Sequence, residues 1–197
     1  MTGQLSIERG KTAVVIMDYQ NDIVGTLPED VRNELLARAS AALESARREG
    51  IPIIYVVVRF REGYPEVSSR DAARRGIRES GRLTEGTPGA EILPEVAPQH
   101  GEVVVTKRRT GAFSTTDLAA VLNAGSIETL VLMGVSTSGC VLSTVRWAAD
   151  IDYRLVVLAD CCADRDEEVH RVLTEKVFPR QAAVVTSQEF IQALGGT

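Results

Sequence analysis

Histidine, cysteine and long hydrophobic runs are all scarce in this chain of 197 residues. Its three cysteines include the adjacent pair Cys161 and Cys162, and an odd number with two neighbours does not form a disulfide framework. We therefore expect a reducing, cytoplasmic location. A membrane span needs about 20 consecutive apolar residues, and the first residues lack the apolar core of a signal peptide. We expect no membrane partner.

Motifs for common cofactors are also missing. The sequence has no Gly-x-Gly-x-x-Gly or Walker-type loop, so a nucleotide cofactor has no support. It has no Cys-x-x-Cys pair and no clustered histidine and carboxylate spacing for zinc. The net charge of -5 gives no general attraction for nucleic acid. We expect no cofactor, no metal and no nucleic-acid partner.

What the chain does have is an alternation of apolar runs and amphipathic segments, typical of one α/β domain spanning residues 1–197. Runs that are apolar throughout, rather than alternating, favour a parallel sheet covered on both faces. The expected strands are 12–18, 51–58, 102–107, 129–134, 154–159 and 182–185. The expected helices are 29–48, 114–123, one beginning at 140, 167–177 and 188–193. Residues 59–100 are irregular, and so long a loop is usually functional.

The segment from Gly134 to Cys140, Gly-Val-Ser-Thr-Ser-Gly-Cys, joins an apolar run to an amphipathic one. This pattern predicts that Cys140 lies in the first turn of a helix that follows a strand. Free N–H groups and the helix dipole at such a position lower a thiol pKa and favour a thiolate nucleophile. A small apolar cysteine packed at a strand–helix junction explains the segment equally well.

Ionisable residues end three of the expected strands. Asp18 ends the first and Lys107 the third, while Cys140 follows the fourth. Each alone has an ordinary explanation, such as a turn cap or a solvated charge, but reactive groups collect at the carboxyl ends of parallel strands. His100 precedes the third strand at its amino end, and His170 fits a structural role in a late helix. We therefore expect Asp18 to accept the thiol proton and Lys107 to supply positive charge.

These residues resemble the isochorismatase-like cysteine hydrolase superfamily, which includes nicotinamidases, N-carbamoylsarcosine amidohydrolases, ureidoacrylate hydrolases and isochorismatases. The resemblance covers nearly the whole chain. It is carried by residues 15–22 (Val-Ile-Met-Asp-Tyr-Gln-Asn-Asp), 86–92, Lys107 with 111–118, 134–141 and 156–160. It implies a three-layer α/β/α fold with Rossmann-like topology and a six-stranded parallel sheet in the order 3-2-1-4-5-6.

The resemblance also implies a catalytic triad at Asp18, Lys107 and Cys140, and a cis peptide just before Ser136. The backbone N–H groups of Ser136 and Cys140 would then form the oxyanion hole. The function implied is hydrolysis of an amide, ureido or carbamoyl C–N bond of a small molecule through a thioester. The alternatives are isochorismatase-type vinyl-ether hydrolysis and a non-catalytic, redox-responsive thiol protein. The family implies a homodimer or homotetramer.

Departures of this sequence from the family's motifs narrow the range of possible substrates. Nicotinamidases carry an Asp-x-His and further histidines after the second strand, but residues 59–65 here contain no histidine, so we expect a metal-independent enzyme. Candidate substrate-binding residues are Gln20, Ile23, Arg59, Arg109 and Phe113. Of these, the two arginines would bind a substrate carboxylate, and Phe113 fits the core as well. The many arginines of residues 59–82 also fit a solvated, partly helical insertion. Cys161, Cys162 and Trp147 are expected to pack in the core.

Overall fold

A six-stranded parallel sheet forms the centre of the computed structural model, which describes residues 5–195. The strands are β1 (Thr12–Met17), β2 (Ile53–Val58), β3 (Val103–Lys107), β4 (Thr129–Val135), β5 (Arg154–Ala163) and β6 (Ala183–Val185). Their order across the sheet is β3-β2-β1-β4-β5-β6, which confirms the expected fold. The order reverses between β1 and β4, and a crevice forms beyond the carboxyl ends of the strands at such a point.

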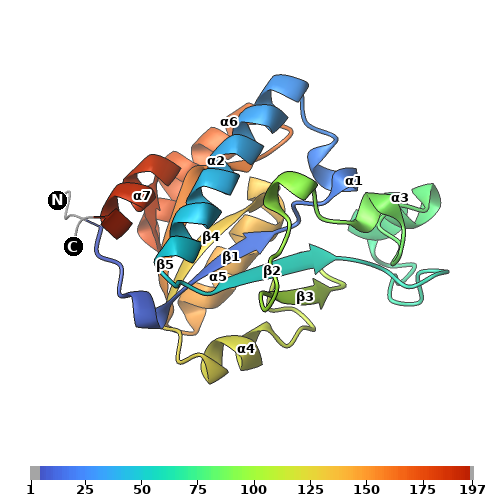
Figure 1. The fold of residues 1–197 in the computed structure, drawn as a ribbon. Helices are drawn as coiled ribbons and strands as arrows, with labels where there is room; N and C mark the ends of the chain where they lie inside the picture. Colours follow the sequence, from blue (N-terminus) through green and yellow to red (C-terminus); the bar gives the residue numbers. More distant parts are fainter. Residues whose placement is uncertain (1–4, 196–197) are drawn as a thin grey trace.

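Helices cover both faces of the sheet (Figure 1). They are α1 (Asn21–Val24), α2 (Glu29–Arg48), α3 (Ala72–Ser80), α4 (Leu118–Ala124), α5 (Leu142–Asp150), α6 (Glu167–Val172) and α7 (Ser187–Gly195). Residues of α2 and α7 belong to the core on one face, and residues of α4 and α5 to the core on the other. The helix α3 lies away from both layers, at the end toward which β2 points (Figure 1).

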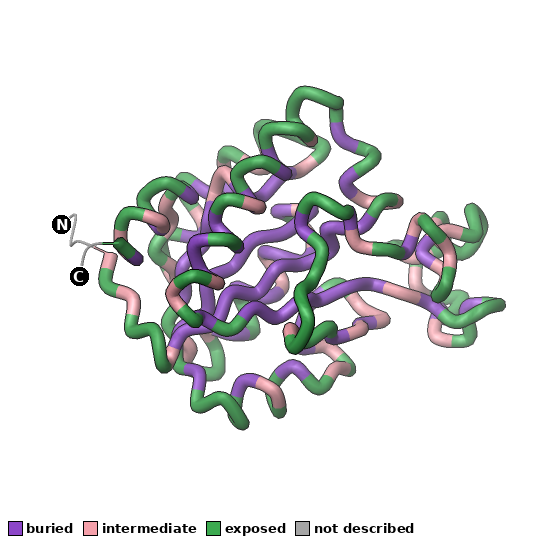
Figure 2. Tube along the Cα trace, viewed as in Figure 1, coloured by how far each residue is buried: buried purple, intermediate pink, exposed green. Residues whose placement is uncertain are grey.

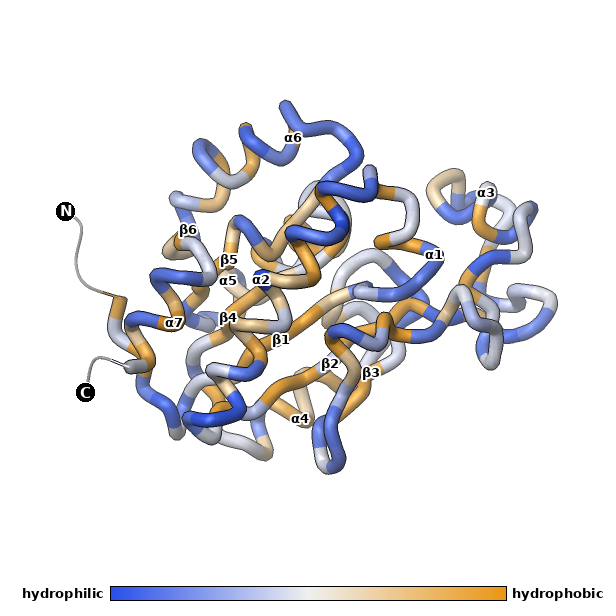
Figure 3. Tube along the Cα trace, turned by 45° about the horizontal axis from the view of Figure 1, so that its top comes forward, coloured by the Kyte–Doolittle hydropathy of each residue, from blue (hydrophilic) through white to orange (hydrophobic). Residues whose placement is uncertain are grey.

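The two cores follow from the alternation of side chains along each strand. In β1, Val14 and Ile16 belong to the cluster beneath α2 and α7, whereas Ala13, Val15 and Met17 belong to the other. The strands are accordingly buried along most of their length (Figure 2) and strongly hydrophobic (Figure 3). The two edge strands are the exceptions, because Val103 and Val104 of β3 are exposed and β6 has no buried residue.

The long helix α2 has the bounds that its sequence pattern predicts. Apolar residues recur at helical spacing and are buried, namely Leu35, Leu36, Ala39, Leu43 and Ala46. The acids Glu29 and Asp30 occupy its first turn, where the helix dipole favours negative charge. The helix ends before Gly50, which adopts a φ of 68°, a conformation that glycine accepts without a steric penalty.

Several expected boundaries are wrong. The helix expected from residue 114 begins only at Leu118, because Thr115 has a left-handed φ of 63° and the hydroxyl of Thr116 donates to Ala112 O over 2.6 Å. The helix expected over 167–177 changes to a π-helical turn at Leu173. The strand expected to end at residue 159 continues to Ala163.

The longer β5 places Cys161 and Cys162 inside the strand, where both are buried as expected. Trp147, in contrast, was expected in the core and is 51% exposed. It lies on the outer side of α5, while Val145 and Ala148 face the sheet. No helix within residues 5–195 is both long and apolar enough to cross a membrane.

Candidate active site

Asp18 and Lys107 form a buried ion pair at the carboxyl edge of the sheet. Asp18 directly follows β1, and Lys107 is the last residue of β3. The distance from Lys107 Nζ to Asp18 Oδ2 is 2.7 Å, and the two side chains are only 2% and 6% exposed. Lys107 Nζ also donates to Thr110 O over 2.6 Å. These two bonds fix the ammonium group beside the carboxylate with little water around it.

The backbone at Asp18 turns sharply out of the strand. Its φ is 60°, a left-handed conformation that aspartate tolerates better than most residues, and its N–H donates to Val56 O over 2.8 Å. The second carboxylate oxygen, Oδ1, is buried and accepts no hydrogen bond from the described part of the chain, residues 5–195. The Cys140 thiol interacts with the same carboxylate. Asp18 therefore holds Lys107 with one oxygen and keeps the other free to accept a proton.

Burial also changes the basicity of Asp18. Desolvation raises the pKa of its carboxyl group above the ordinary value, and the charge of Lys107 and its hydrogen bond oppose this rise. A carboxylate with a raised pKa is a stronger base, and proton transfer is most efficient when the pKa lies near the working pH. The net result is a carboxylate that is more basic than an exposed aspartate.

Cys140 lies in the π-helical turn η4 (Thr137–Val141), which follows β4 and leads into α5. Its thiol is nearly inaccessible and donates to Ser136 O over 3.6 Å. Burial and the negative charge of Asp18 raise the pKa of this thiol well above its ordinary value. The expectation of a resting thiolate is therefore wrong, because desolvation outweighs the helix dipole at this position.

Ser136 directly precedes the turn η4 and Cys140 lies within it, and both residues line a cleft at the carboxyl edge of the sheet. The peptide bond between Val135 and Ser136 is cis. Ser136 O accepts hydrogen bonds from the N–H groups of Gly139 and Val141. Gly134 precedes this turn, and a Cβ added there would lie 3.1 Å from Cys140 Sγ and from Met17 Cβ. The absence of a side chain at Gly134 thus allows the sulfur to reach its place.

A cleft of about 710 Å³ opens above the three residues, a volume suited to a small organic molecule. Asp18, Lys107 and Cys140 form part of its floor, and α3 supplies one wall through Ala73, Arg74, Gly76, Ile77 and Ser80. Apolar contacts come from Ile23 and Leu27 on another side. The irregular region of the sequence therefore closes over the reactive groups.

The structure brings only two of the five candidate substrate-binding residues to the cleft, Ile23 and Arg109. Gln20 is fully buried instead. Its amide donates to Val58 O and Ala90 O over 2.9 and 2.7 Å, and its Oε1 accepts from Val58 N over 2.8 Å. Gln20 thus connects the end of β2 to the loop around Ala90.

Arg59 and Phe113 also lie outside the cleft lining. Arg59 donates to Ala90 O and pairs with Glu91 over 3.1 Å, because its side chain follows the loop rather than the cavity. Phe113 is a core residue of the α4 and α5 face, with its ring centroid 6.1 Å from that of Tyr153.

Four arginines line the cleft: Arg74, Arg82, Arg109 and Arg165. Arg74 pairs with Asp71 over 2.8 Å, and Arg82 lies 3.9 Å from Asp22. Neither Arg109 nor Arg165 forms an ion pair with a carboxylate among residues 5–195, although the charge of Arg109 acts on the carboxyl group of Asp71. Arg109 donates to the carbonyls of Glu66 and Arg108, and Arg165 donates to the Thr26 hydroxyl. Arg165 was not predicted as a cleft residue, because β5 was expected to end at residue 159 and in fact continues to Ala163, close to Arg165 in the chain.

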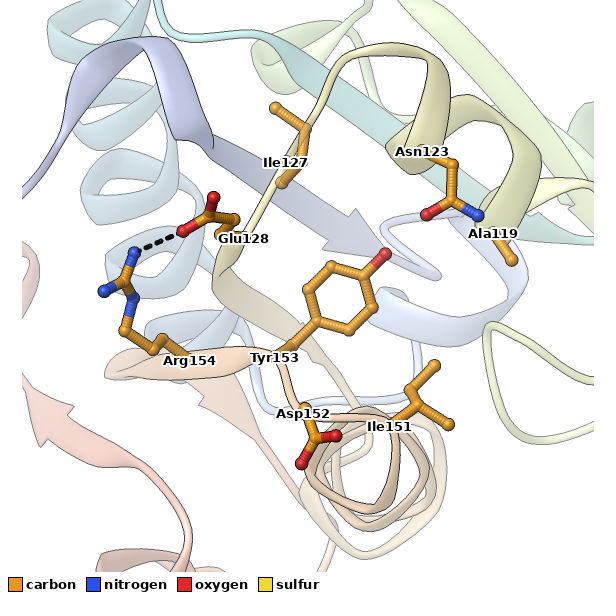
Figure 4. A pocket seen from close by; sticks show the side chains of 8 residues that line it. All are labelled: Ala119, Asn123, Ile127, Glu128, Ile151, Asp152, Tyr153 and Arg154. Carbon is orange, nitrogen blue, oxygen red and sulfur yellow. Dashed lines mark hydrogen bonds and ion pairs between the residues drawn. The ribbon is translucent and has the colours of Figure 1, made fainter.

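A further hollow lies at the opposite edge of the sheet, where β4 and β5 begin (Figure 4). Its lining includes Asn123, Tyr153 and the ion pair between Glu128 and Arg154, whose N–O distance is 2.9 Å. This lining contains neither a cysteine nor a lysine. The reactive groups gather in the cleft at the carboxyl edge and not in this hollow.

Comparison with known proteins agrees with this architecture. The sequence model of the isochorismatase domain matches residues 12–189. An isochorismatase family protein of Bacillus subtilis is 32% identical over 98% of this chain and 98% of its own length. The maleamate amidohydrolase of Pseudomonas putida is 32% identical over 80% of this chain and 73% of its own. The structure of N-carbamoylsarcosine amidase from Thermoplasma acidophilum is 28% identical, with a TM-score of 0.74 over 90% of this chain and 96% of that one.

Proposed function

The chain belongs to the isochorismatase family of hydrolases, and from this premise we propose that it is a cysteine amidohydrolase. The reaction is hydrolysis of a C–N bond in a small amide, ureido or carbamoyl compound that carries a carboxylate. One observation carries the proposal, namely that a buried thiol lines the same cleft as a buried carboxylate and its ammonium partner, which are 2.7 Å apart.

The first half of the reaction begins from the neutral thiol. Asp18 accepts the proton of Cys140 through its free oxygen as the sulfur attacks the carbonyl carbon of the substrate. Lys107 keeps a positive charge beside Asp18 before and after the transfer. The N–H groups of Ser136 and Cys140 stabilise the oxyanion, and one such donor typically contributes 10²–10³ in rate. Asp18 then gives its proton to the departing nitrogen, which leaves a thioester on Cys140.

The second half uses the same groups. Asp18, again a carboxylate, accepts a proton from water, and the hydroxide equivalent attacks the thioester carbon. Collapse of this intermediate releases the carboxylic acid, and the proton on Asp18 returns to the sulfur. The resting thiol and carboxylate are thereby restored.

The chemistry of the cleft supports a carboxylate-bearing substrate. Arg109 and Arg165 line the cavity and form no ion pair with a carboxylate of residues 5–195, and a guanidinium group binds a carboxylate in a bidentate manner. The relatives named for maleamate and N-carbamoylsarcosine act on amides that carry this group. Asp18 and Lys107, which line the same cavity, would then face the scissile bond.

Metal independence is part of the proposal. Within residues 5–195, no group of three or more histidine, cysteine or acidic side chains is arranged to hold a metal ion. Lys107 occupies the position next to Asp18 where positive charge is needed. We expect that treatment with a strong chelator, followed by assay in metal-free buffer, leaves the rate of hydrolysis unchanged.

The test measures ammonia release from maleamate, N-carbamoylsarcosine and an uncharged amide such as acetamide. We expect the protein to hydrolyse maleamate, N-carbamoylsarcosine or both. Acid-quenched samples should then contain a covalent acyl adduct on Cys140. Cys140→Ala should lower kcat by at least about 10⁴-fold, the scale on which nucleophile removal acts in hydrolases. Cys161→Ala is the matched control, because Cys161 is a buried cysteine that does not line the cleft.

Two outcomes would reject this function. Undiminished activity of Cys140→Ala would exclude the thioester route. Pyruvate release from isochorismate that persists in Cys140→Ala would identify vinyl-ether hydrolysis, in which the aspartate acts without the sulfur.

A further inference from the structure

Two side chains from the segment after β5 hold the turn η4. Asp164 Oδ2 accepts a hydrogen bond from Ser138 N over 2.7 Å. Thr137 Oγ1 lies 2.8 Å from His170 Nδ1. The turn that carries Cys140 therefore has anchors on both of its first two residues, and neither anchor belongs to the helix that follows the turn.

Thr137 is the more deeply placed of the two anchored residues. It is fully buried, and its neighbour in the chain is Ser136, whose N–H is assigned above to the oxyanion. A buried hydroxyl requires a hydrogen-bond partner, and the imidazole of His170 is the partner that the structure provides. A shift of Thr137 would move Ser136 on one side and the rest of the turn on the other.

His170 is held in place to form this hydrogen bond. It lies in α6, whose start is fixed by Asp166, because the Asp166 side chain accepts from the N–H groups of Glu168 and Val169. Burial lowers the pKa of His170, although the charges of Asp164 and Glu167 oppose the change. In a neutral imidazole one ring nitrogen accepts a hydrogen bond and the other donates one, so Nδ1 pairs with the Thr137 hydroxyl in either tautomer.

We propose that His170 is a positioning residue, which acts through the Thr137 hydroxyl to hold the Ser136 and Cys140 N–H groups where the oxyanion forms. The inference rests on the function proposed above. His170 does not line the cleft, so it does not touch the substrate. Its effect is on the transition state alone, because the oxyanion develops only there.

The experiment compares variants that keep or remove the hydrogen bond between Thr137 and His170. Thr137→Val removes the hydroxyl at constant shape, and Thr137→Ser keeps it. His170→Gln keeps polarity but loses the polar atom at the Nδ1 position, whereas the shorter His170→Asn retains it. We expect Thr137→Val and His170→Gln each to lower kcat about tenfold with KM within twofold. The matched variants Thr137→Ser and His170→Asn should stay within threefold of the unmodified protein.

The double variant Thr137→Val/His170→Gln decides whether the two residues act together. If they share one bond, the double variant loses no more kcat than the worse single variant. The inference is overturned if the losses in kcat multiply in the double variant. It is also overturned if KM rises instead of kcat falling, or if both single variants are fully active. Melting temperatures measured in parallel show which variants retain the fold.

A second readout needs no substrate. A loosened turn exposes the buried sulfur, so iodoacetamide should alkylate Cys140 at least fivefold faster in Thr137→Val and His170→Gln than in their matched partners. Equal alkylation rates in all four variants would overturn the inference even if the unmodified protein hydrolysed none of the amides. Absence of amide hydrolysis together with the expected alkylation rates would overturn the proposed function alone.

Discussion

In the proposed mechanism, Cys140 is a nucleophile that is not ionised at rest. Burial and the nearby Asp18 carboxylate both disfavour its thiolate form. The charge needed for attack must therefore arise as the proton moves to Asp18. This arrangement protects the sulfur from oxidants between turnovers, because the thiolate is the reactive form of cysteine.

The reactivity of this thiol in the absence of substrate depends on its ionisation. Its pKa is raised, so the thiolate fraction below pH 9 should increase about tenfold per pH unit. We expect the rate of alkylation of Cys140 by iodoacetamide to rise with pH over pH 6–9 without levelling off. Labelling of Cys140→Ala measures the background from Cys161 and from Cys162, whose pKa burial raises to about 12. A plateau near pH 7 would show that Cys140 rests as a thiolate.

Gly134 is the second residue on which the position of the sulfur depends. Gly134→Ala would place a methyl group 3.1 Å from Cys140 Sγ and from Met17, and the buried neighbours must move. We expect kcat to fall at least tenfold and the free energy of unfolding to fall by about 1–3 kcal/mol, the usual cost of overpacking a core.

Steady-state kinetics and urea denaturation measure the two effects of Gly134→Ala. Gly10→Ala is the control, because no atom lies within 4 Å of the added group. Unchanged kinetics in Gly134→Ala would show that the turn η4 adapts to the extra methyl group and that sulfur placement is not tightly constrained.

At the scale of elements, the sequence predicts the strands well and the turns poorly. A run such as residues 12–17 is apolar throughout, and only a strand buried on both faces uses that pattern. The start of α4 could not be predicted, because it depends on the left-handed backbone of Thr115. The exposure of Trp147 was missed because the side of α5 that meets the sheet is decided by packing and not by hydrophobicity alone.

The helix α3 is the least firmly packed element around the cleft. None of its residues is buried, and Arg74 in its first turn donates to the hydroxyl of Thr110 over 2.7 Å. Segments with few buried apolar contacts open at low free-energy cost. We expect trypsin to cleave the native protein first after arginines in or beside this helix, namely Arg70, Arg74, Arg75 or Arg78.

The contact with Thr110 provides a matched pair of variants for the proteolysis experiment. Thr110→Val removes the acceptor for Arg74 and should speed the first cleavage several-fold, while Thr110→Ser keeps the acceptor and should not. Mass spectrometry of the earliest fragments identifies the sites. First cleavage within α2, which contains Arg32, Arg38, Arg47 and Arg48, would show that α3 is not the weakest element.

At the scale of the whole molecule, the parallel sheet explains why three distant positions could be grouped from the sequence. Asp18, Lys107 and Cys140 are far apart in the chain, but each stands at the carboxyl end of a strand, and those ends share one edge. The cleft lining was less predictable. Gln20 and Arg59 lie near the reactive residues along the chain, yet their side chains turn to the loop around Ala90, and nothing local in the sequence specifies that direction.

The charge of the whole molecule affects how an anionic substrate binds. The net charge of -5 repels an anionic substrate at long range, so its attraction must come from Arg109 and Arg165 at the cleft. The Debye length falls from about 30 Å at 0.01 M salt to about 3 Å at 1 M. Contacts between a carboxylate and partly exposed guanidinium groups should therefore weaken as salt is added.

We expect KM for a carboxylate-bearing amide to rise several-fold between about 0.02 and 0.5 M sodium chloride, with kcat nearly constant. An uncharged amide of similar size is the control and should show no such change. The Arg109→Gln/Arg165→Gln variant should have a high KM for the carboxylate at low salt and little further dependence on salt. If this variant kept the salt dependence of the unmodified protein, the substrate carboxylate would have to bind elsewhere, and the cleft arginines would serve only to hold the loops around it.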